Sequence, residues 1–413
     1  MTLTGVTNHD YLIVPSLRNV LLSTAYEAGA RVHTNSWGNL GGIYGQTAYD
    51  ADAFTFEHPD FLLIFSAGNS GQSGVESCGS PSISKNGVSV GAEQLHDSVT
   101  DALQKELTVT YFSSIGPSYD GRIKPDIVAP GDYVMSAFAG RPEAIMNAAK
   151  GYPLGYGEGT EKVVETCAVH QMSGTSMAAP TVAGVALLIR QYFMDSNFWA
   201  EACNRHYSTC KAGAFEPSGY FVKAILLHAG QAMQKYSNPG DNIVTTISSF
   251  ELGPPPDNYQ GYGTVRLQNV LPLTTPGGLN PALDLVIWDK LELLEHHTRL
   301  WTIDFSSSII QPLKITVSWY DPPSPLYSAS TLLLHDVDLV VVAPNGDRFW
   351  GNRVEGGDDI NTNEQVYIEK PTCHLKSSCV YQVYLHSHAL TQGVSMNVAV
   401  IITTSGKSVP VQF

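Results

Sequence analysis

The sequence predicts two successive folds: an α/β domain with a mostly parallel sheet and flanking helices over residues 1–275, and an antiparallel β-sandwich over residues 276–413. In the first part, helical patterns alternate with short, continuously apolar strands, which is typical of strands buried on both faces of a parallel sheet. In the second part, polar and apolar residues alternate with period two between Gly, Pro and Asn turns. We place the boundary in "TTPGGLNP".

The elements of the first part are expected in the following order. A helix over "SLRNVLLSTAYEAG" begins after Pro15 and ends at Gly29, because its apolar residues recur at helical spacing. Two more helices are expected later, at "TVAGVALLIRQYF" and "SGYFVKAILLHAGQAM". Strands are expected at "ARVHTNSW", "FLLIFSAGN", "NGVSVGA", "LTVTYFSSIGP" and "RIKPDIVAPG".

The second part contains five clear strand patterns and no helical one. Within the third pattern, "PNG" is a hairpin signal. The chain has no internal repeat and no low-complexity tract. The strand patterns are "RLWTIDF", "LKITVSWY", "HDVDLVVVAPNGDRFWGN", "CVYQVYLHSH" and "VSMNVAVIIT".

Composition limits the possible partners. Hydrophobic residues make up 43% of the 413 residues, so the chain can bury sizeable cores. The net charge of −15 and the lack of a long basic run argue against nucleic acid and anionic membrane surfaces as partners. No apolar run approaches the ~18 residues of a membrane-spanning helix, so we expect no membrane span. We expect a monomer.

The six cysteines favour disulfides and an oxidising compartment. Two pairs are close in sequence, Cys203 with Cys210 and Cys373 with Cys379, and we expect the second to close the tip of a hairpin. Cys78 with Cys167 follows only by elimination. A metal site remains the alternative for the short pairs, because a histidine lies inside each loop. We therefore expect a secreted protein, or one in the lumen of the secretory pathway.

"QMSGTSMAAPTVAG" contains the main candidate for chemistry, Ser176. Small residues precede it and a helix begins near it, so Ser176 would lie where free N–H groups and the helix dipole favour a developing negative charge. Pro180 agrees with a helix that begins near Ser176, if the proline lies in the first turn. A helix N-cap serine is the simpler interpretation of this stretch taken by itself.

Taken together, four ordered segments resemble the subtilisin-like serine proteases. "GTSMAAP" resembles their nucleophile motif, "HTNSWG" the substrate-binding strand, and "FSAGNSG" the segment with the oxyanion asparagine, here Asn69. "FSSIGPSYDGRIKPDIVAPG" resembles the stretch before the nucleophile, with Ile115 where arginine is common. With its β-rich tail, the layout is similar to alkaline subtilases that have a jelly-roll-like C-terminal domain. The resemblance thus implies a partial subtilisin-like sheet followed by that domain.

The resemblance also implies catalytic residues that this sequence lacks. Subtilases carry an aspartate and a histidine in D-[ST]-G and H-G-T-H motifs upstream of the substrate-binding strand, and the 32 residues before His33 contain neither. His9 is adjacent to Asp10, so their side chains would point apart, and His33, His58 and His170 are better explained as structural. We therefore expect that the sequence is the C-terminal part of a longer precursor, whose missing part also carries the signal peptide. Without the missing strands, "ARVHTNSW" would form an uncovered sheet edge.

The resemblance further implies a primary specificity pocket. It also makes a calcium site one of two interpretations of the acidic segments in the second part. The pocket would be lined by Ser36, Trp37, Gly38, Ala67 and Gly68, whose small residues leave space for a large apolar side chain. Calcium prefers oxygen ligands, and two acidic segments offer them, although solvated acidic loops are the alternative. The candidate ligands are Asp336, Asp338, Asp358 and Asp359, with Asn361, Asn363 and Glu364 nearby.

The leading hypothesis is a serine endopeptidase that hydrolyses peptide bonds of protein or peptide substrates. Ser176 would be the nucleophile and Asn69 would hold the oxyanion, while the upstream aspartate and histidine are absent here. The alternative is a catalytically inactive pseudoprotease that acts as a binding module. Upstream sequence containing the two missing motifs would exclude the alternative.

Overall fold

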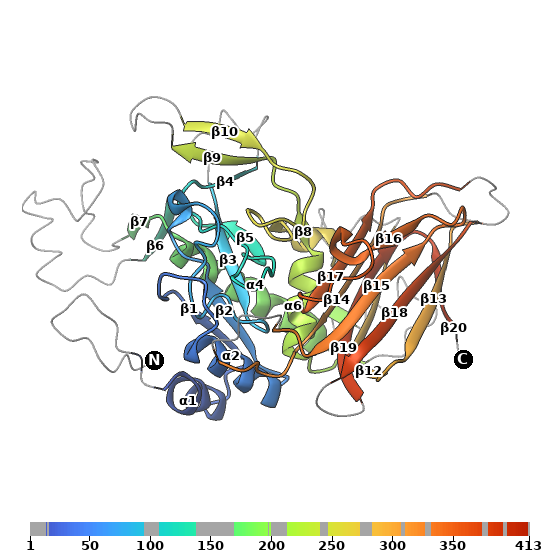
Figure 1. Ribbon diagram of the computed structural model, residues 1–413, viewed down its shortest axis with the longest axis horizontal. Coiled ribbons are helices and arrows are strands. Elements are labelled where there is room, and N and C mark those ends of the chain that lie inside the picture. Colours follow the sequence, from blue (N-terminus) through green and yellow to red (C-terminus); the bar gives the residue numbers. More distant parts are fainter. Residues whose placement is uncertain are drawn as a thin grey trace, which may run out of the picture.

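The computed structural model describes residues 14, 16–94, 107–137, 169–196, 198–199, 213–239, 247–272, 283–306, 310–326, 332–373, 379–390 and 395–411. A mixed sheet with helices forms the first part, and two antiparallel sheets beside it form the second (Figure 1). The predicted fold class is therefore confirmed. The predicted boundary between 275 and 276 lies outside the described residues.

The first sheet is mostly parallel at its centre, where β1, β2, β3, β5 and β11 pair in that order. Every residue of β2 and β3 is buried, and the continuous apolar run of β2 predicts this burial. Among the described residues β1 pairs with β2 alone, so it is the expected open edge. The strands are β1 (Val32–Asn35), β2 (Leu62–Ser66), β3 (Val88–Glu93), β4 (Thr108–Val109), β5 (Ile127–Pro130), β8 (Gly230–Gln231), β9 (Lys235–Pro239), β10 (Ile247–Glu251) and β11 (Thr264–Val265).

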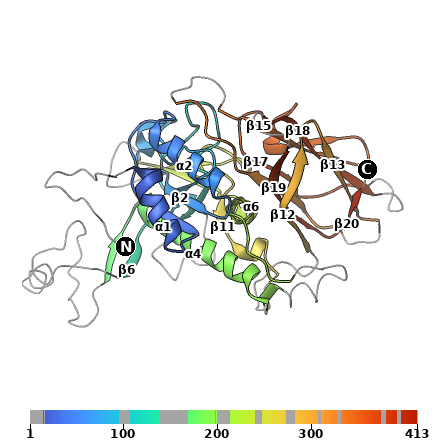
Figure 2. The ribbon, with the colours of Figure 1, turned by 90° about the horizontal axis from the view of Figure 1, so that it is seen from below.

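Helices cover both faces of this sheet (Figure 2). Phe61, Leu63 and Phe65 of the β2 segment pack against the first helices, while Leu62 and Ile64 face α4 and α6. This alternation follows from the period of two along a strand. The helices are a π-helical stretch η1 (Leu17–Leu22), α1 (Ser23–Glu27), α2 (Gln46–Glu57), α4 (Thr175–Met194) and α6 (Gly219–His228).

Three of these helices occur where the sequence predicts them. The first opens with π-helical turns, and the Ser16 hydroxyl accepts a hydrogen bond from the Asn19 N–H at 3.2 Å. Helix α2 was not predicted, because it lacks a side-chain N-cap and because acidic residues lie among its buried positions. Asp52 is one of them; it accepts hydrogen bonds from the Tyr44 hydroxyl and from the N–H groups of Lys85 and Asn86. Tertiary contacts therefore determine this helix.

Helix α4 is the described helix that is relevant to the expectation that the chain has no membrane-spanning segment. By length and composition it could cross a membrane, with a mean hydropathy of 1.2 over an 18-residue window. Core helices of folded domains pass the same test, and Ala178, Val182, Ala186 and Ile189 of α4 are fully buried against the sheet.

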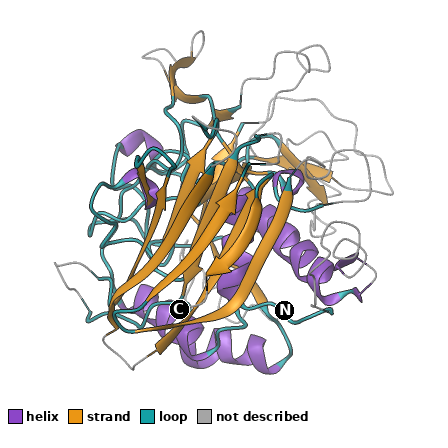
Figure 3. Ribbon diagram, turned by 90° about the vertical axis from the view of Figure 1, so that its right-hand side faces the viewer, coloured by secondary structure: helices purple, strands orange, loops and turns teal. Residues whose placement is uncertain are grey.

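The second part is a sandwich whose two inner faces form one core. One sheet has the order β12-β19-β14-β17 and the other β16-β15-β18-β13-β20, and Figure 3 views these strands from outside the molecule. The "PNG" hairpin between β15 and β16 is confirmed, with Gly346 at φ +91°. The strands are β12 (Asp284–Leu294), β13 (Thr298–Asp304), β14 (Leu313–Trp319), β15 (His335–Val342), β16 (Arg348–Trp350), β17 (Asn363–Ile368), β18 (Val380–Leu390), β19 (Ser395–Thr404) and β20 (Lys407–Val411).

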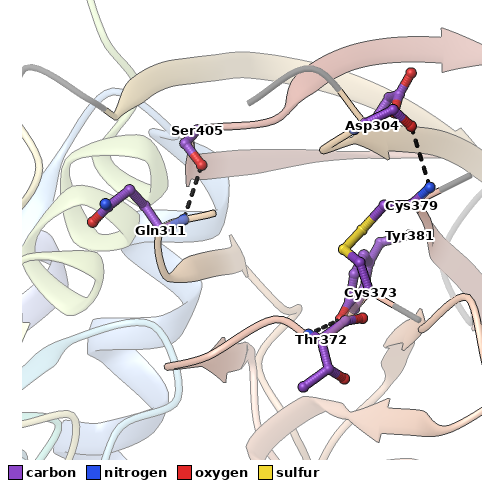
Figure 4. Close-up of a disulfide and its surroundings, with 8 residues drawn as sticks. Asp304, Gln311, Thr372, Cys373, Cys379, Tyr381 and Ser405 are labelled. Carbon is purple, nitrogen blue, oxygen red and sulfur yellow. Dashed lines mark hydrogen bonds between the residues drawn. A yellow bond between two sulfur atoms is a disulfide. The ribbon is translucent and has the colours of Figure 1, made fainter. Parts of the chain in front are cut away.

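One predicted disulfide is present, but not at a hairpin tip. Cys373 and Cys379 are bonded, with their Cα atoms 5.3 Å apart (Figure 4). The strand before them, β17, pairs with β14, whereas β18 after them pairs with β13 and β15 in the other sheet. The bond therefore closes a connection between the two sheets. The alternation of polar and apolar residues was predicted correctly, but it does not specify which strand is the partner.

The pairing of Cys78 with Cys167 is wrong. Cys78 is a free, fully buried thiol, and burial raises its pKa to about 12. It packs as a small apolar residue beside Tyr44, Ala67 and Ile83. Cys167, Cys203 and Cys210 lie outside the described residues.

Helix α6 lies between the two parts of the molecule. Its apolar residues share one core with Leu285, Ala399 and Ile401 of the sandwich. At its end, the two ring nitrogens of His228 lie 2.9 and 3.0 Å from the hydroxyls of Thr316 and Thr403, on β14 and β19. Burial holds the pKa of His228 well below its usual value, so the ring is neutral. The sandwich is therefore packed onto the α/β part through a helix of that part.

A buried ion pair joins the same two parts. Lys85, in the loop before β3, and Asp321, after β14, are paired, and both side chains are fully buried. The Lys85 ammonium also donates to the Pro322 carbonyl at 2.5 Å, the Ser324 hydroxyl at 2.6 Å and the Leu332 carbonyl at 2.9 Å. Every proton of the ammonium thus has an acceptor from the second part.

We predict that Lys85→Met lowers the free energy of unfolding by about 3–5 kcal/mol, because it leaves the Asp321 carboxylate buried without its cation. Urea unfolding followed by tryptophan fluorescence measures the loss. Glu251→Gln is the matched control, since Glu251 is exposed and 3.7 Å from Lys235; we expect a change below about 0.5 kcal/mol. The double variant Lys85→Met/Asp321→Leu should recover part of the loss. A loss no larger than that of the control would show that the ion pair does not hold the two parts together.

Candidate active site

Ser176 lies in the first turn of α4, partly exposed, at the end of the helix that faces the loops after β2 and β5. The approach to it is fixed by a 2.7 Å hydrogen bond from the Gly174 N–H to the Gly131 carbonyl. The first N–H groups of a helix have no intrahelical acceptor and lie at the positive end of its dipole. The position therefore favours negative charge, as the sequence predicts.

Pro180 changes the hydrogen bonding of Ser176 itself. The proline lies in the second turn of α4, not in the first as expected. Because it has no N–H, it cannot donate to the carbonyl four residues earlier, which is that of Ser176. The Ser36 hydroxyl donates to this carbonyl instead, at 2.9 Å. The proline thus leaves the Ser176 carbonyl free to accept the hydrogen bond from Ser36, which links the segment after β1 to the start of α4.

Asn69, which follows β2, is oriented by Thr175. Its side-chain oxygen Oδ1 accepts hydrogen bonds from the Thr175 N–H and from the Thr175 hydroxyl, both at 2.9 Å. The amide nitrogen Nδ2 has no hydrogen-bond partner among the described residues. A Cβ atom at Gly174 would lie 3.3 Å from this nitrogen, so the glycine leaves space beside Asn69 Nδ2. The site therefore presents an amide donor beside Ser176.

The role of Thr175 was missed in the sequence. Its hydroxyl also accepts a hydrogen bond from the Gly68 N–H at 3.2 Å, so it joins the loop after β2 to the start of α4. Only its position before Ser176 could have suggested this. Gly68 must be glycine, since its φ is +115° and a Cβ there would lie 2.7 Å from the Ser114 hydroxyl.

The structure brings the predicted pocket residues to the same end of the sheet. Ser36, Trp37 and Gly38 follow β1, and Ala67 and Gly68 follow β2. The parallel pairing of Asn35 with Phe65 places the two segments side by side. Gly38 approaches the loop before β3 closely, since a Cβ there would lie 3.0 Å from the Ser80 carbonyl oxygen. Their role in binding substrate stays a prediction.

The described histidines have structural surroundings. His33 lies on β1, where Asn35 is 3.0 Å from its Nδ1 and burial lowers its pKa. His58 stacks on Phe54 with ring centroids 4.3 Å apart, and its Nδ1 lies 2.9 Å from the Phe54 carbonyl. His170 lies on β7 (Val169–Met172), opposite Ser136 of β6 (Val134–Ala137). His9 and Asp10 lie outside the described residues. Within those residues, no histidine or carboxylate hydrogen-bonds to the Ser176 hydroxyl.

Two of the four candidate calcium ligands, Asp338 and Asp358, are joined directly by a hydrogen bond in the sandwich. The Asp358 N–H donates to Asp338 Oδ1 at 3.0 Å, and His388 pairs with the other Asp338 oxygen. The Asp358 carboxylate accepts hydrogen bonds from the side-chain amides of Asn352 and Asn361. In the part of the chain that the structure describes, no three acidic, histidine or cysteine side chains are grouped so as to hold a metal.

The carboxylates nevertheless crowd one another. Burial and the neighbouring Asp338 raise the pKa of Asp336 to about 6. Burial and then Asp358 raise the pKa of Glu364 well above its usual value. Asp336 Oδ1 and Glu364 Oε1 are both buried without a hydrogen-bond partner in the described structure. Calcium binding therefore stays a prediction. The buried carboxylate oxygens without hydrogen-bond partners favour it. The Asp358 carboxylate argues against it, because side-chain amides already donate hydrogen bonds to its oxygens.

Comparison with known proteins finds serine proteases among the relatives of this chain. A serine protease/ABC transporter B family protein, tagD, from Dictyostelium discoideum is 25% identical over 84% of this chain and 23% of its own length. The serine protease AprX of Bacillus subtilis is 38% identical over 32% of this chain and 27% of its own length. The chain thus spans about a quarter of these relatives. Among solved structures, sphericase covers 60% of this chain at 19% identity with a TM-score of 0.36, which is too weak to support an inference.

A family model covers the elements that build the site. The model of the Subtilase family matches residues 16–263, from the residue before the first helix to the residue before β11, and includes Asn69, Thr175 and Ser176. This span is well over half of the chain. The chain belongs to the subtilase family of serine peptidases.

Proposed function

We propose that this chain carries the nucleophile and the oxyanion site of a serine endopeptidase that cleaves peptide bonds in proteins. The observation that carries the proposal is the orientation of Asn69. Thr175 occupies its Oδ1 twice, which leaves Nδ2 as a donor beside Ser176. A fixed donor of this kind stabilises the charge that develops on a carbonyl oxygen under nucleophilic attack.

In the proposed reaction, the Ser176 hydroxyl attacks the scissile carbonyl. The negative oxygen that forms is held by Asn69 Nδ2 and by the Ser176 N–H, at the positive end of α4. A residue outside this sequence takes the hydroxyl proton and later gives it to the leaving amine. The proposed reaction therefore needs an acid–base pair that the described residues do not place at the Ser176 hydroxyl.

Two features of the surface support this requirement. The outer edge of β1 has no partner strand among the described residues, and unpaired strand edges are normally covered. One face of α4 also exposes large apolar side chains: Leu187 is 57% exposed, Leu188 55% and Met194 47%. A further segment that supplied a histidine near Ser176 could cover both.

We predict that the 413-residue chain alone hydrolyses peptides barely or not at all. Loss of the histidine of a subtilisin triad costs about 10⁶-fold in turnover, a magnitude that belongs to subtilisin itself and is carried over to this chain. An internally quenched peptide assay of the purified chain, with Ser176→Ala as the control, tests this. Ordinary protease turnover that Ser176→Ala abolishes would show that a base within the chain has been overlooked.

In an enzyme with a complete triad, we predict that Thr175→Val lowers kcat about tenfold with little change in KM, because Asn69 loses the hydroxyl that orients it. Asn69→Ala should lower kcat by about 10²–10³. Thr181→Val is the matched control: it lies in the same helix, and its hydroxyl donates only to the Met177 carbonyl, at 3.0 Å. Equal kcat values for the Thr175 and Thr181 variants would contradict the role of Thr175.

We further propose that the protein belongs to an oxidising compartment, secreted or within the secretory pathway, and that calcium stabilises its sandwich. The Cys373–Cys379 disulfide supports the first proposal. The buried oxygens of Asp336 and Glu364 that lack partners support the second.

We predict that millimolar calcium raises the melting temperature of the chain relative to EDTA, because a divalent cation would relieve the repulsion among the crowded carboxylates. Scanning calorimetry measures this shift. Asp338→Asn should remove it, whereas Asp347→Asn, at the exposed β15–β16 turn, should not. Equal melting temperatures with calcium and with EDTA would exclude the site.

A further inference from the structure

The two sheets of the sandwich differ in what covers their outer faces. Helix α6 packs on the sheet that contains β14 and β19. The other sheet, β16-β15-β18-β13-β20, lies on the side of the sandwich away from α6, at the right of Figure 1, and Figure 3 views the molecule from that side. Its outer face is remote from the candidate active site.

The residues of this second sheet that face inward are fixed by the sandwich core. Successive side chains of a strand point to opposite faces of the sheet. The core residues on β13, β15 and β18 include Trp301, Leu339, Val341, Val383 and Leu385. The residues that alternate with them along the chain therefore point outward.

Four of the outward-facing residues form a row that we call the outer stripe: Trp350, Val340, Tyr384 and Leu300. Val340, Tyr384 and Leu300 are directly opposite one another on β15, β18 and β13, and Trp350 of β16 is opposite Val340. All four side chains are partly exposed. At the usual spacing of neighbouring strands the outer stripe is about 14 Å long, and its two aromatic residues are about 10 Å apart.

Hydrogen-bond donors along the outer stripe have no acceptor in the described part of the chain. Gln382 lies on the same face as Tyr384, and its Oε1 accepts a hydrogen bond from the Tyr384 hydroxyl at 2.9 Å, which leaves the amide nitrogen as a donor. Arg348 lies on the same face as Trp350; it is exposed and has no described partner. The indole N–H of Trp350 also has none among the described residues.

This combination determines which chemistry suits the outer stripe. Exposed aromatic and aliphatic residues in a row offer apolar area to a ligand. The unused donors disfavour a lipid or an apolar protein surface, because such a partner would bury them without acceptors. The stripe itself carries no charge, and the net charge of −15 disfavours a polyanion.

An uncharged sugar chain meets these three conditions. A hexopyranose ring has a face of C–H groups that can lie on an aromatic or aliphatic side chain, and a rim of hydroxyls that accept hydrogen bonds. The outer stripe is longer than one sugar ring and crosses four strands. Its length therefore favours several consecutive sugars over a single one.

We propose that the outer stripe binds a linear, uncharged polysaccharide. Sugar rings lie on Trp350 and Tyr384, and their hydroxyls accept hydrogen bonds from Gln382 and Arg348. The sandwich thereby holds the protein on a polysaccharide surface, while the candidate active site at the other end of the molecule remains free. The proposal does not depend on the proposed peptidase activity.

Titration calorimetry of the 413-residue chain with cellohexaose, maltohexaose and chitohexaose tests this proposal. We expect at least one of these hexasaccharides to bind. Trp350→Ala should weaken that binding about tenfold, because it removes an aromatic surface on which a sugar ring lies. Tyr367→Ala is the matched control, since Tyr367 is an aromatic residue of β17 in the other sheet and is 54% exposed; its Kd should not change. Ser176→Ala should also bind unchanged.

A second variant keeps the test decisive if Trp350→Ala does not fold. Gln382→Leu replaces an exposed side chain outside the core, removes a donor and adds apolar area, so it should weaken sugar binding about fivefold. An apolar partner would instead bind this variant more tightly. No binding of any hexasaccharide at millimolar concentration, or equal Kd values for the native chain and both stripe variants, would overturn the proposal. It would also be overturned if the stripe bound only phosphatidylcholine vesicles, a glycan released from a glycoprotein, or a second copy of the chain in sedimentation experiments.

Discussion

The buried ammonium of Lys85 is the contact on which the arrangement of the two parts depends. Burying a charge is costly unless it is paired and fully hydrogen-bonded, and its acceptors all come from the segment between Asp321 and Leu332. The surrounding backbone is held as well: the Lys223 ammonium, itself fully buried, donates to the Lys85 carbonyl at 3.0 Å and to that of Gly87 at 3.2 Å. The sandwich is thus part of the structural support of the α/β part.

This support extends to the candidate site through the loop before β3. At its other end, the Ser80 carbonyl accepts a hydrogen bond from the Asn39 N–H at 2.8 Å, and the Gly79 N–H donates to the Ala67 carbonyl at 3.3 Å. The loop therefore contacts both segments of the predicted specificity pocket. A displacement of the sandwich would be transmitted through Lys85 to these segments, because packed interiors yield little to strain.

Most of the strands could be predicted from the sequence, because a strand buried on both faces is continuously apolar and a strand buried on one face alternates polar and apolar residues. The sequence did not predict α2, whose buried Asp52 is explained only by donors from the Lys85 loop. It placed Ser176 and Asn69 in one site only through the resemblance to a family, and it missed Thr175. Hydrogen bonds between residues about a hundred positions apart, such as that from Thr175 to Asn69, leave no periodic signal. The predicted hairpin between the segments of β17 and β18 was wrong for the same reason, because the pattern does not specify which strands pair.

Contacts with Thr175 hold Asn69 in position with its amide nitrogen available as a donor. A crystal structure of the 413-residue chain with a bound substrate peptide tests this most directly. We expect a peptide carbonyl oxygen within about 2.7–3.1 Å of both Asn69 Nδ2 and the Ser176 N–H, with Asn69 Oδ1 still accepting from Thr175. A peptide bound elsewhere, or an Asn69 side chain turned so that Nδ2 faces a protein acceptor, would contradict it.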